Sequence, residues 1–172
     1  YLFLFLVVIF ISFAKNIEEI EDMTINIEER LSLNGDIKKS EYILQYIKPD
    51  FIRKVILSPE LNKGEIYIYD SKKKVMYLPL FDQVSEEILN EEEDSTLEAI
   101  NYILKEKKEF KEGKINLKDG LIIELKKLKK FSEYTLPEII IIYDGNVKVG
   151  ELKIKNYKIN SKLNKEELSL HD

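Results

Sequence analysis

Residues 24–35 read TINIEERLSLNG, and this stretch indicates the fold most directly. Apolar and polar side chains alternate along it, so that one face of the extended chain carries Ile25, Ile27, Leu31 and Leu33. Such an alternation is typical of a β-strand that is buried on one side. The strand ends at Asn34-Gly35, a dipeptide that strongly favours a β-hairpin turn. The stretch therefore predicts the first hairpin of an antiparallel sheet.

Short predicted strands follow one another along the rest of the chain. They cover residues 41–48, 51–57, 65–70, 75–80, 114–117, 121–128, 134–143 and 146–159. Asp119-Gly120 and Asp144-Gly145 mark further hairpin turns. Strands at intervals of about 8–12 residues are typical of an all-β sandwich or barrel. Because the chain has 172 residues and no recognisable linker, we expect one domain.

Two predicted helices interrupt the strands. Residues 15–23 favour a short amphipathic helix, because apolar side chains recur at intervals of three at Ile17, Ile20 and Met23. Residues 95–107 favour a longer helix that begins with the capping box Ser95-Thr96-Leu97-Glu98. Its apolar stripe consists of Leu97, Ile100, Ile103 and Leu104. Such a stripe needs an apolar partner, so we expect this helix to lie over the concave side of the sheet.

Several predicted strands are apolar on both faces. Residues 65–70 carry isoleucines on one face and tyrosines on the other, and residues 75–80 and 139–142 are likewise apolar on both. Buried parallel strands show this pattern, but the chain lacks the alternation of strands and helices that a parallel sheet requires. Either the sheet curls so that helices fill its concave side, or it leaves apolar space for a ligand. A fully filled core with tyrosines at its rim is the alternative.

The first fourteen residues, YLFLFLVVIFISFA, form an apolar run that ends in Ser12-Phe13-Ala14 and is followed by Lys15. A membrane-spanning helix needs about 20 apolar residues, so the run is short for that purpose. The small-large-small ending is typical of a signal-peptidase site. We predict a signal peptide over residues 1–14 that is cleaved after Ala14, its basic n-region preceding Tyr1. A buried apolar segment and a retained membrane anchor are the alternatives.

The composition argues against several classes of protein. A formal net charge of −5 argues against nucleic-acid binding. The absence of cysteine excludes disulfides, thiolate catalysis and cysteine-bound metals. The single histidine, His171, is the second-last residue, which argues against Ser-His-Asp triads and multi-histidine metal sites. These absences argue most strongly against common hydrolases and metalloenzymes, and we predict no catalytic residue, no metal, no cofactor and no enzymatic activity.

Three segments in the first half resemble one known family. They are KPDFIR at residues 48–53, GEIYIYD at residues 64–70 and VMYLP at residues 75–79. With YTLP at residues 134–137 and YDG at residues 143–145, they resemble the periplasmic LolA-like proteins that sort outer-membrane lipoproteins. The resemblance extends over residues 15–170 and makes residues 15–172 a single LolA-like domain.

The resemblance implies a fold and a function. The fold is a mainly antiparallel β-sheet with two helices (α+β), bent into an unclosed, strongly curved β-barrel with a helical lid. The function is to shelter lipoprotein acyl chains in an apolar cavity, as a periplasmic monomer without bond chemistry. An inner-membrane lipoprotein-releasing transporter and an outer-membrane acceptor are the implied partners. Arg53, and with less support Lys48, match the basic position that helps to hold the lid in that family.

The two-faced strands suggest a lining for the cavity. It consists of Ile25, Ile27, Leu31, Leu33, Leu44, Val55, Leu57, Ile66, Ile68, Met76 and Leu78. The choice of face on the middle strands stays open at this stage. Two other functions also stay open: a periplasmic lipoprotein- or lipid-sensing domain with a regulatory role, and a periplasmic enzyme acting on lipid or glycan. The enzyme is disfavoured because no Ser, His or Asp cluster stands in a motif.

Overall fold

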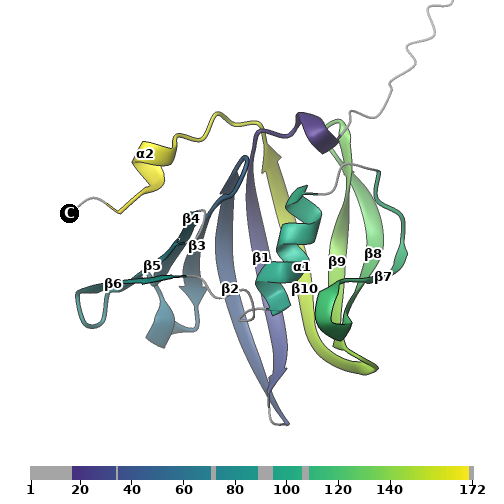
Figure 1. The fold of residues 1–172 in the computed structure, drawn as a ribbon, viewed down its shortest axis with the longest axis horizontal. Helices are drawn as coiled ribbons and strands as arrows, with labels where there is room; N and C mark the ends of the chain where they lie inside the picture. Colours follow the sequence, from purple (N-terminus) through teal and green to yellow (C-terminus); the bar gives the residue numbers. More distant parts are fainter. Residues whose placement is uncertain (1–16, 34, 71–72, 89–94, 106–108, 171–172) are drawn as a thin grey trace, which may run out of the picture.

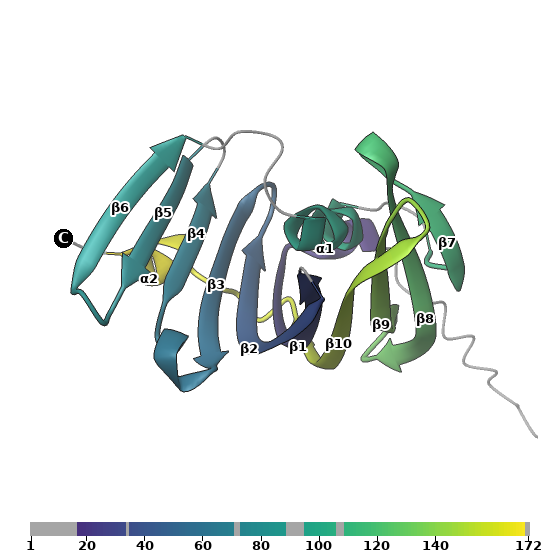
Figure 2. The ribbon, with the colours of Figure 1, turned by 90° about the horizontal axis from the view of Figure 1, so that it is seen from below.

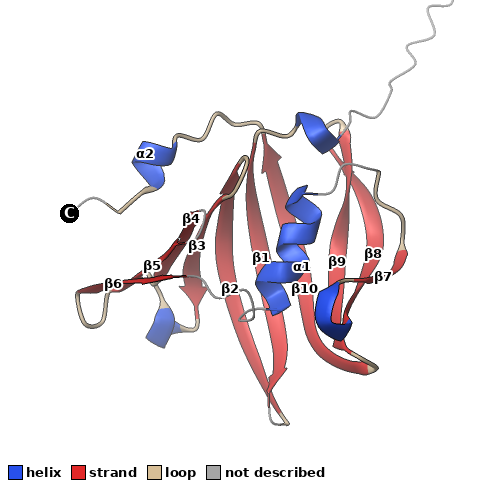
Figure 3. Ribbon diagram, viewed as in Figure 1, coloured by secondary structure: helices blue, strands red, loops and turns tan. Residues whose placement is uncertain are grey.

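The computed structural model describes residues 17–33, 35–70, 73–88, 95–105 and 109–170, which form ten strands and several short helices (Figures 1 and 3). The strands are β1 Asp22–Leu33, β2 Asp36–Ile47, β3 Phe51–Ser58, β4 Ile66–Asp70, β5 Lys73–Leu78, β6 Gln83–Ile88, β7 Gly113–Asn116, β8 Leu121–Phe131, β9 Tyr134–Asp144 and β10 Val147–Ile159. The α-helices are α1 Ser95–Lys105 and α2 Lys165–Leu168, and the 3₁₀ turns are η1 Ile17–Glu19, η2 Glu60–Asn62 and η3 Lys118–Gly120. The predicted signal peptide, residues 1–14 with its cleavage site after Ala14, lies outside the described residues.

All ten strands belong to one antiparallel sheet with the order β6-β5-β4-β3-β2-β1-β10-β9-β8-β7. The sheet does not close, because β6 and β7 are its two edges. β1 and β2 are paired from Leu33 and Asp36 onward, which confirms the hairpin predicted at Asn34-Gly35. Gly35 has a φ of 86°, a backbone conformation that glycine adopts without steric strain. Figure 2 shows that the sheet bends around α1, whereas β3 to β6 extend away from it.

Helix α1 fills the concave side of the bent sheet (Figure 2). Its buried side chains are Thr96, Ala99, Ile100, Ile103 and Leu104. The apolar ones form one hydrophobic cluster with inward-facing side chains from the strands, including Ile27, Leu44 and Leu152. Burial of each large aliphatic side chain stabilises the fold by about 1.5–3 kcal/mol, so this contact is a major part of the core. The predicted fold class and the predicted position of this helix are confirmed.

Three local predictions differ from the structure. The helix predicted over residues 15–23 is reduced to η1 in the described part, because β1 already begins at Asp22. Met23 is buried and paired with Tyr46 and Ile159, and hydrogen bonding on both sides of β1 outweighs a weak helical pattern. Strand β6 was not predicted, because its largely exposed sequence QVSEEI shows no buried face. The short helix α2 was not predicted either; the Asn164 side chain caps it by accepting the Glu166 N–H.

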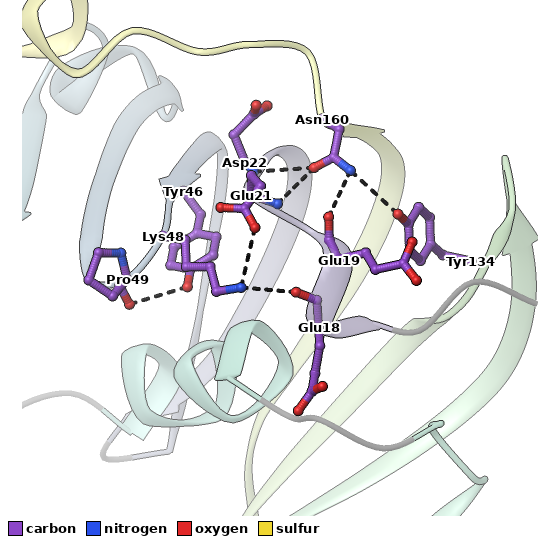
Figure 4. Close-up of polar contacts among 9 residues, drawn as sticks. All are labelled: Glu18, Glu19, Glu21, Asp22, Tyr46, Lys48, Pro49, Tyr134 and Asn160. Atoms are coloured by element: carbon purple, nitrogen blue, oxygen red, sulfur yellow. Dashed lines mark hydrogen bonds and ion pairs between the residues drawn. The ribbon is translucent and has the colours of Figure 1, made fainter.

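A polar clasp at one end of the sheet ties the start of β1 to the end of β10 (Figure 4). The Asn160 side-chain oxygen accepts the N–H groups of Glu21 at 2.8 Å and Asp22 at 3.4 Å. Its amide nitrogen donates to the Glu19 carbonyl at 3.0 Å and the Tyr134 hydroxyl at 3.4 Å. Asn160 therefore satisfies backbone donors at the end of η1 that would otherwise have no partner within the sheet.

The segment that follows the clasp, residues 161–170, runs along the outer side of the sheet and is called the C-terminal strap. The buried Asp22 carboxylate accepts the N–H groups of Ser161 and Lys162, each at 2.8 Å. Further along, Lys165 forms an ion pair with Asp70 at 2.8 Å and lies 5.4 Å from the Phe51 ring centroid. The strap thus covers one end of the outer face of β3 and β4.

Candidate functional site

The space between α1 and the strands is filled. A cavity of about 10 Å³ remains there, and it is lined by Leu44, Lys54, Tyr69, Thr96, Leu97 and Ile100. Such a volume holds about one water molecule and no acyl chain. The sequence left open whether helices or a ligand fill the concave side of the sheet. In the structure, α1 fills it.

The inner face continues beyond α1 as a half-buried apolar surface. Cross-strand pairing places Leu44, Lys54, Tyr67 and Met76 in one row on the inner side of β2 to β5. Leu78 lies two residues beyond Met76 and therefore on the same side. Tyr67 and Leu97 pack against the core cluster from its margin. We call Tyr67, Met76, Leu78 and Leu97 the inner apolar surface.

Two polar groups lie within this surface. The Lys54 ammonium is 4.1 Å from the Tyr42 ring centroid, a cation–π contact that leaves the aliphatic stem against apolar neighbours. The Tyr67 hydroxyl donates to Glu65 at 2.6 Å. Burial and this acceptor raise the pKa of Tyr67, so its hydroxyl stays protonated in neutral solution. The surface therefore offers one cation and one neutral hydroxyl beside apolar side chains.

A second opening lies on the other flank of α1, next to edge strand β7. This groove has a volume of about 600 Å³. Its apolar lining includes Tyr102, Phe110 and Ile115, and its charged lining consists of Glu109, Lys111, Glu112 and Lys114, two residues of each sign. The volume is within the range of small-molecule sites, about 300–1,000 Å³. Helix α1 is thus flanked by apolar surface on both sides.

The structure divides the predicted cavity lining between the two faces of the sheet. By strand register, the inner face holds Ile25, Ile27, Leu31, Leu44, Met76 and Leu78. The outer face holds Val55, Ile66 and Ile68, and Leu57 lies on that side too, 42% exposed at the end of β3. Leu33 ends β1, and its side chain lies outside the described part. The four outer residues therefore do not line a common cavity with the rest, because alternation along each strand sends neighbours to opposite sides.

The prediction that Arg53 contacts the helical lid also differs from the structure. Arg53 is paired in register with Gln45 and Ile68, on the face opposite α1, and donates to the Gln45 side-chain oxygen at 2.7 Å. Burial among apolar neighbours lowers its pKa. Lys48, by contrast, does contact a helical element. Its ammonium donates to the Glu18 carbonyl of η1 at 2.9 Å (Figure 4).

A row of apolar side chains crosses the outer face from β2 to β6. It consists of Ile43, Val55, Ile66, Tyr77 and Val84, each paired with the next. The neighbouring residues Phe51 and Ile68 are buried but lie outside the main core cluster, at the end that the C-terminal strap covers. The strap and this outer row explain why the middle strands are apolar on both faces. The sequence contains the alternating signal, but no pattern along a single strand says which face meets α1.

Within the described ranges, no group of three or more His, Cys, Asp or Glu side chains is arranged to hold a metal ion. In the same ranges, none of the helices has the length and apolar character needed to cross a membrane.

The fold is similar to that of several solved structures. A LolA superfamily protein from Nitrosomonas europaea matches with a TM-score of 0.64 and 9% identity, over 88% of this chain and 91% of that one. A putative outer membrane lipoprotein-sorting protein domain from Vibrio parahaemolyticus matches with a TM-score of 0.59 and 10% identity, over 86% and 89%. A DUF1329 family protein from Desulfovibrio piger matches with a TM-score of 0.61 and 10% identity, over 89% and 93%.

No family model matches the sequence, and no curated protein matches it. At identities of 9–10%, the similarity to these structures is one of fold. The expected resemblance is confirmed at that level: the chain has the LolA-like fold, an unclosed and curved antiparallel sheet with a helix over its concave side.

Proposed function

We propose that the protein is a carrier that shelters lipoprotein acyl chains on its inner face and delivers them toward the outer membrane. The observation that supports this most is the inner apolar surface, which continues the hydrophobic core beyond α1 instead of ending it at the helix. Sheltering each methylene group stabilises a complex by about 0.8 kcal/mol, so about ten of them contribute about 8 kcal/mol. Apolar burial alone can therefore hold an acyl chain, and no covalent step is needed.

The geometry suggests how an acyl chain binds. Its first part lies along Tyr67, Met76 and Leu78, where the surface is half-buried and accessible. Deeper entry requires α1 to move outward, because the cavity of about 10 Å³ beneath it admits no chain. The Lys54 ammonium stands at the boundary between the two regions. In this proposal it donates to a carbonyl oxygen of the acyl linkage.

The proposal includes the route of the cargo. The signal peptide directs export and is cleaved after Ala14, and the mature protein acts in the periplasm as a monomer. It receives its cargo from an inner-membrane lipoprotein-releasing transporter and passes it to an outer-membrane acceptor. A structural neighbour with the same fold is named as a putative outer membrane lipoprotein-sorting protein domain, and this supports lipoproteins as the cargo.

A transfer assay tests the proposal. The purified exported protein is incubated with inner-membrane vesicles that contain a labelled lipoprotein, and the soluble fraction is then mixed with outer-membrane vesicles. We expect the label to appear first in a soluble complex and then in the acceptor vesicles. Organic extracts of the soluble complex should contain acylated cargo by mass spectrometry. A stable complex that never releases its cargo would instead support the lipoprotein-sensing function.

A further inference from the structure

Two neighbouring turns at one end of the sheet expose large apolar side chains. Leu61 in η2 is 75% exposed, and Leu80 and Phe81 in the β5–β6 turn are 68% and 70% exposed. The turns are in contact, since a Cβ atom on Gly64 would lie 3.4 Å from Cγ of Pro79. Figures 1 and 2 both show η2 and the β5–β6 turn at the same end of β3 to β6. We call Leu61, Leu80 and Phe81 the apolar tip.

Hydrogen bonds hold both turns in shape. The Phe81 N–H donates to the Leu78 carbonyl at 3.1 Å, and the Asp82 N–H donates to the Pro79 carbonyl at 3.3 Å. In the other turn, the Asn62 side chain donates to Glu65 at 2.7 Å. Within these turns the side chains of the apolar tip are exposed.

Further apolar side chains adjoin the tip. Val84 is 56% exposed at the end of the outer row, and Leu57 is 42% exposed at the end of β3. Elsewhere, Val147 and Ile37 are exposed on other hairpins, away from this group. Isolated exposed apolar residues are common, whereas a contiguous group marks a contact with a membrane or another protein.

The charges near the tip indicate which kind of membrane or protein surface it can bind. The Lys63 ammonium is paired with Glu60 at 3.3 Å, and Asp82 accepts from the Tyr77 hydroxyl at 3.4 Å. The tip is therefore close to neutral or slightly acidic, which does not complement an anionic surface. A zwitterionic bilayer, whose headgroups carry both charges, complements it. Single side chains that project from turns also suit a soft bilayer, whereas a protein partner would need a shaped pocket for each of them.

We propose that the apolar tip inserts into the surface of a zwitterionic lipid bilayer, with Phe81 and Leu80 as the deepest side chains. This contact is separate from the inner apolar surface and does not depend on the carrier function. It orients the protein so that the β5–β6 turn and η2 face the membrane.

The sequence makes a direct test possible, because the chain contains no tryptophan. Phe81→Trp places a single fluorescent reporter in the tip. Val147→Trp is the matched control, because Val147 is similarly exposed, at 65%, on the separate β9–β10 hairpin. Vesicles of phosphatidylethanolamine and phosphatidylcholine should shift the emission of the first reporter to the blue and leave the second unchanged. If another part of the chain binds to the vesicles, it does so in both variants, so a difference between their emission shifts reports on the apolar tip.

A second measurement tests the charge argument and the energetics. Adding phosphatidylglycerol to the vesicles should not strengthen binding, and high salt should not weaken it. Leu80→Asp combined with Phe81→Asp should lower vesicle partitioning by about a hundredfold, about tenfold for each apolar side chain removed. Acyl-probe binding and thermal stability should stay unchanged, because both positions are exposed. Equal emission shifts from the two reporters would overturn the proposal. Binding that requires anionic lipid would overturn it too, and so would the absence of an emission shift at either position.

Discussion

Val75 and Met76 are consecutive residues of β5, yet they belong to opposite surfaces of the protein. Val75 is paired with Ile68 on the outer face, and Met76 is paired with Tyr67 on the inner face. Both side chains are half-buried, so the two positions differ in their location far more than in their exposure. Because the two residues are adjacent, one substitution at each position can distinguish the proposed acyl site on the inner face from the outer face.

The first prediction uses this pair. Met76→Glu should weaken the binding of a fluorescent fatty-acid probe by about tenfold or more, because it places an ionised carboxylate against the acyl chain. Val75→Glu should leave probe binding unchanged, since its side chain lies on the other side of the sheet. Titrations of the probe, run beside circular-dichroism melts of both variants, provide the measurement. Equal losses in the two variants would contradict the assignment of the inner face.

The second prediction concerns the movement of α1. Leu44 on β2 and Ile100 on α1 line the same small cavity, and the chain has no cysteine of its own. Replacing both with cysteine and oxidising the pair should hold the helix against the sheet and prevent deep acyl binding. Reduction should restore binding, and a thiol assay reports how much of the disulfide has formed. Undiminished binding in the oxidised protein would mean that acyl chains bind without displacement of α1.

The third prediction concerns the polar clasp. Asn160→Ala should lower the free energy of unfolding by about 2 kcal/mol, because it removes several hydrogen bonds worth about 1 kcal/mol each. Asn160 has a φ of 52°, so alanine at this position also adds backbone strain. Asn160→Gly removes the hydrogen bonds without the strain and should destabilise less. Asn156→Ala, at an exposed position of β10, is the control and should have little effect in urea denaturation.

The fourth prediction concerns the charged outer face of the other half of the sheet. A hydrogen bond from Arg30 lowers the pKa of Glu28 below its usual value of 4.5. A hydrogen bond from Tyr143 likewise lowers the pKa of Glu124. A carboxylate with a lower pKa in the folded state stabilises the fold above its unfolded-state pKa, and this contribution disappears as the pH falls through the folded-state pKa. Stability should therefore decrease as the pH falls below about 4.5.

Urea denaturation at a series of pH values measures this dependence. The effect should be small and should shrink in high salt, because both carboxylates are only half-buried, on the outer surface of the sheet, where solvent and ions still reach them. Glu28→Gln combined with Glu124→Gln should flatten the acid side of the profile. An unchanged slope in this double variant would show that other carboxylates are responsible.

Much of the fold follows from local patterns in the sequence. Asn34-Gly35 predicted the first hairpin correctly, because a tight turn depends on the conformations of its own residues. The apolar stripe of α1 predicted its buried side, since one helical period brings Ile100, Ile103 and Leu104 together. Residue types alone were also informative: the lack of cysteine excluded disulfides and thiolate catalysis, and a single histidine argued against multi-histidine metal sites.

The inner and outer faces of β3 to β5 were decided only by the tertiary structure. Ile66 and Tyr67 are both apolar enough to face a core, so alternation along β4 could not say which of them faces α1. Pairing with Val55 and Lys54 sends them to opposite sides, and the strap that contacts Phe51 and Asp70 on the outer face comes from the far end of the chain. The sequence by itself determined that these strands have two apolar faces. Which face meets α1 depends on register and on contacts between distant segments, because a shift of one residue in pairing reverses every side chain of a strand.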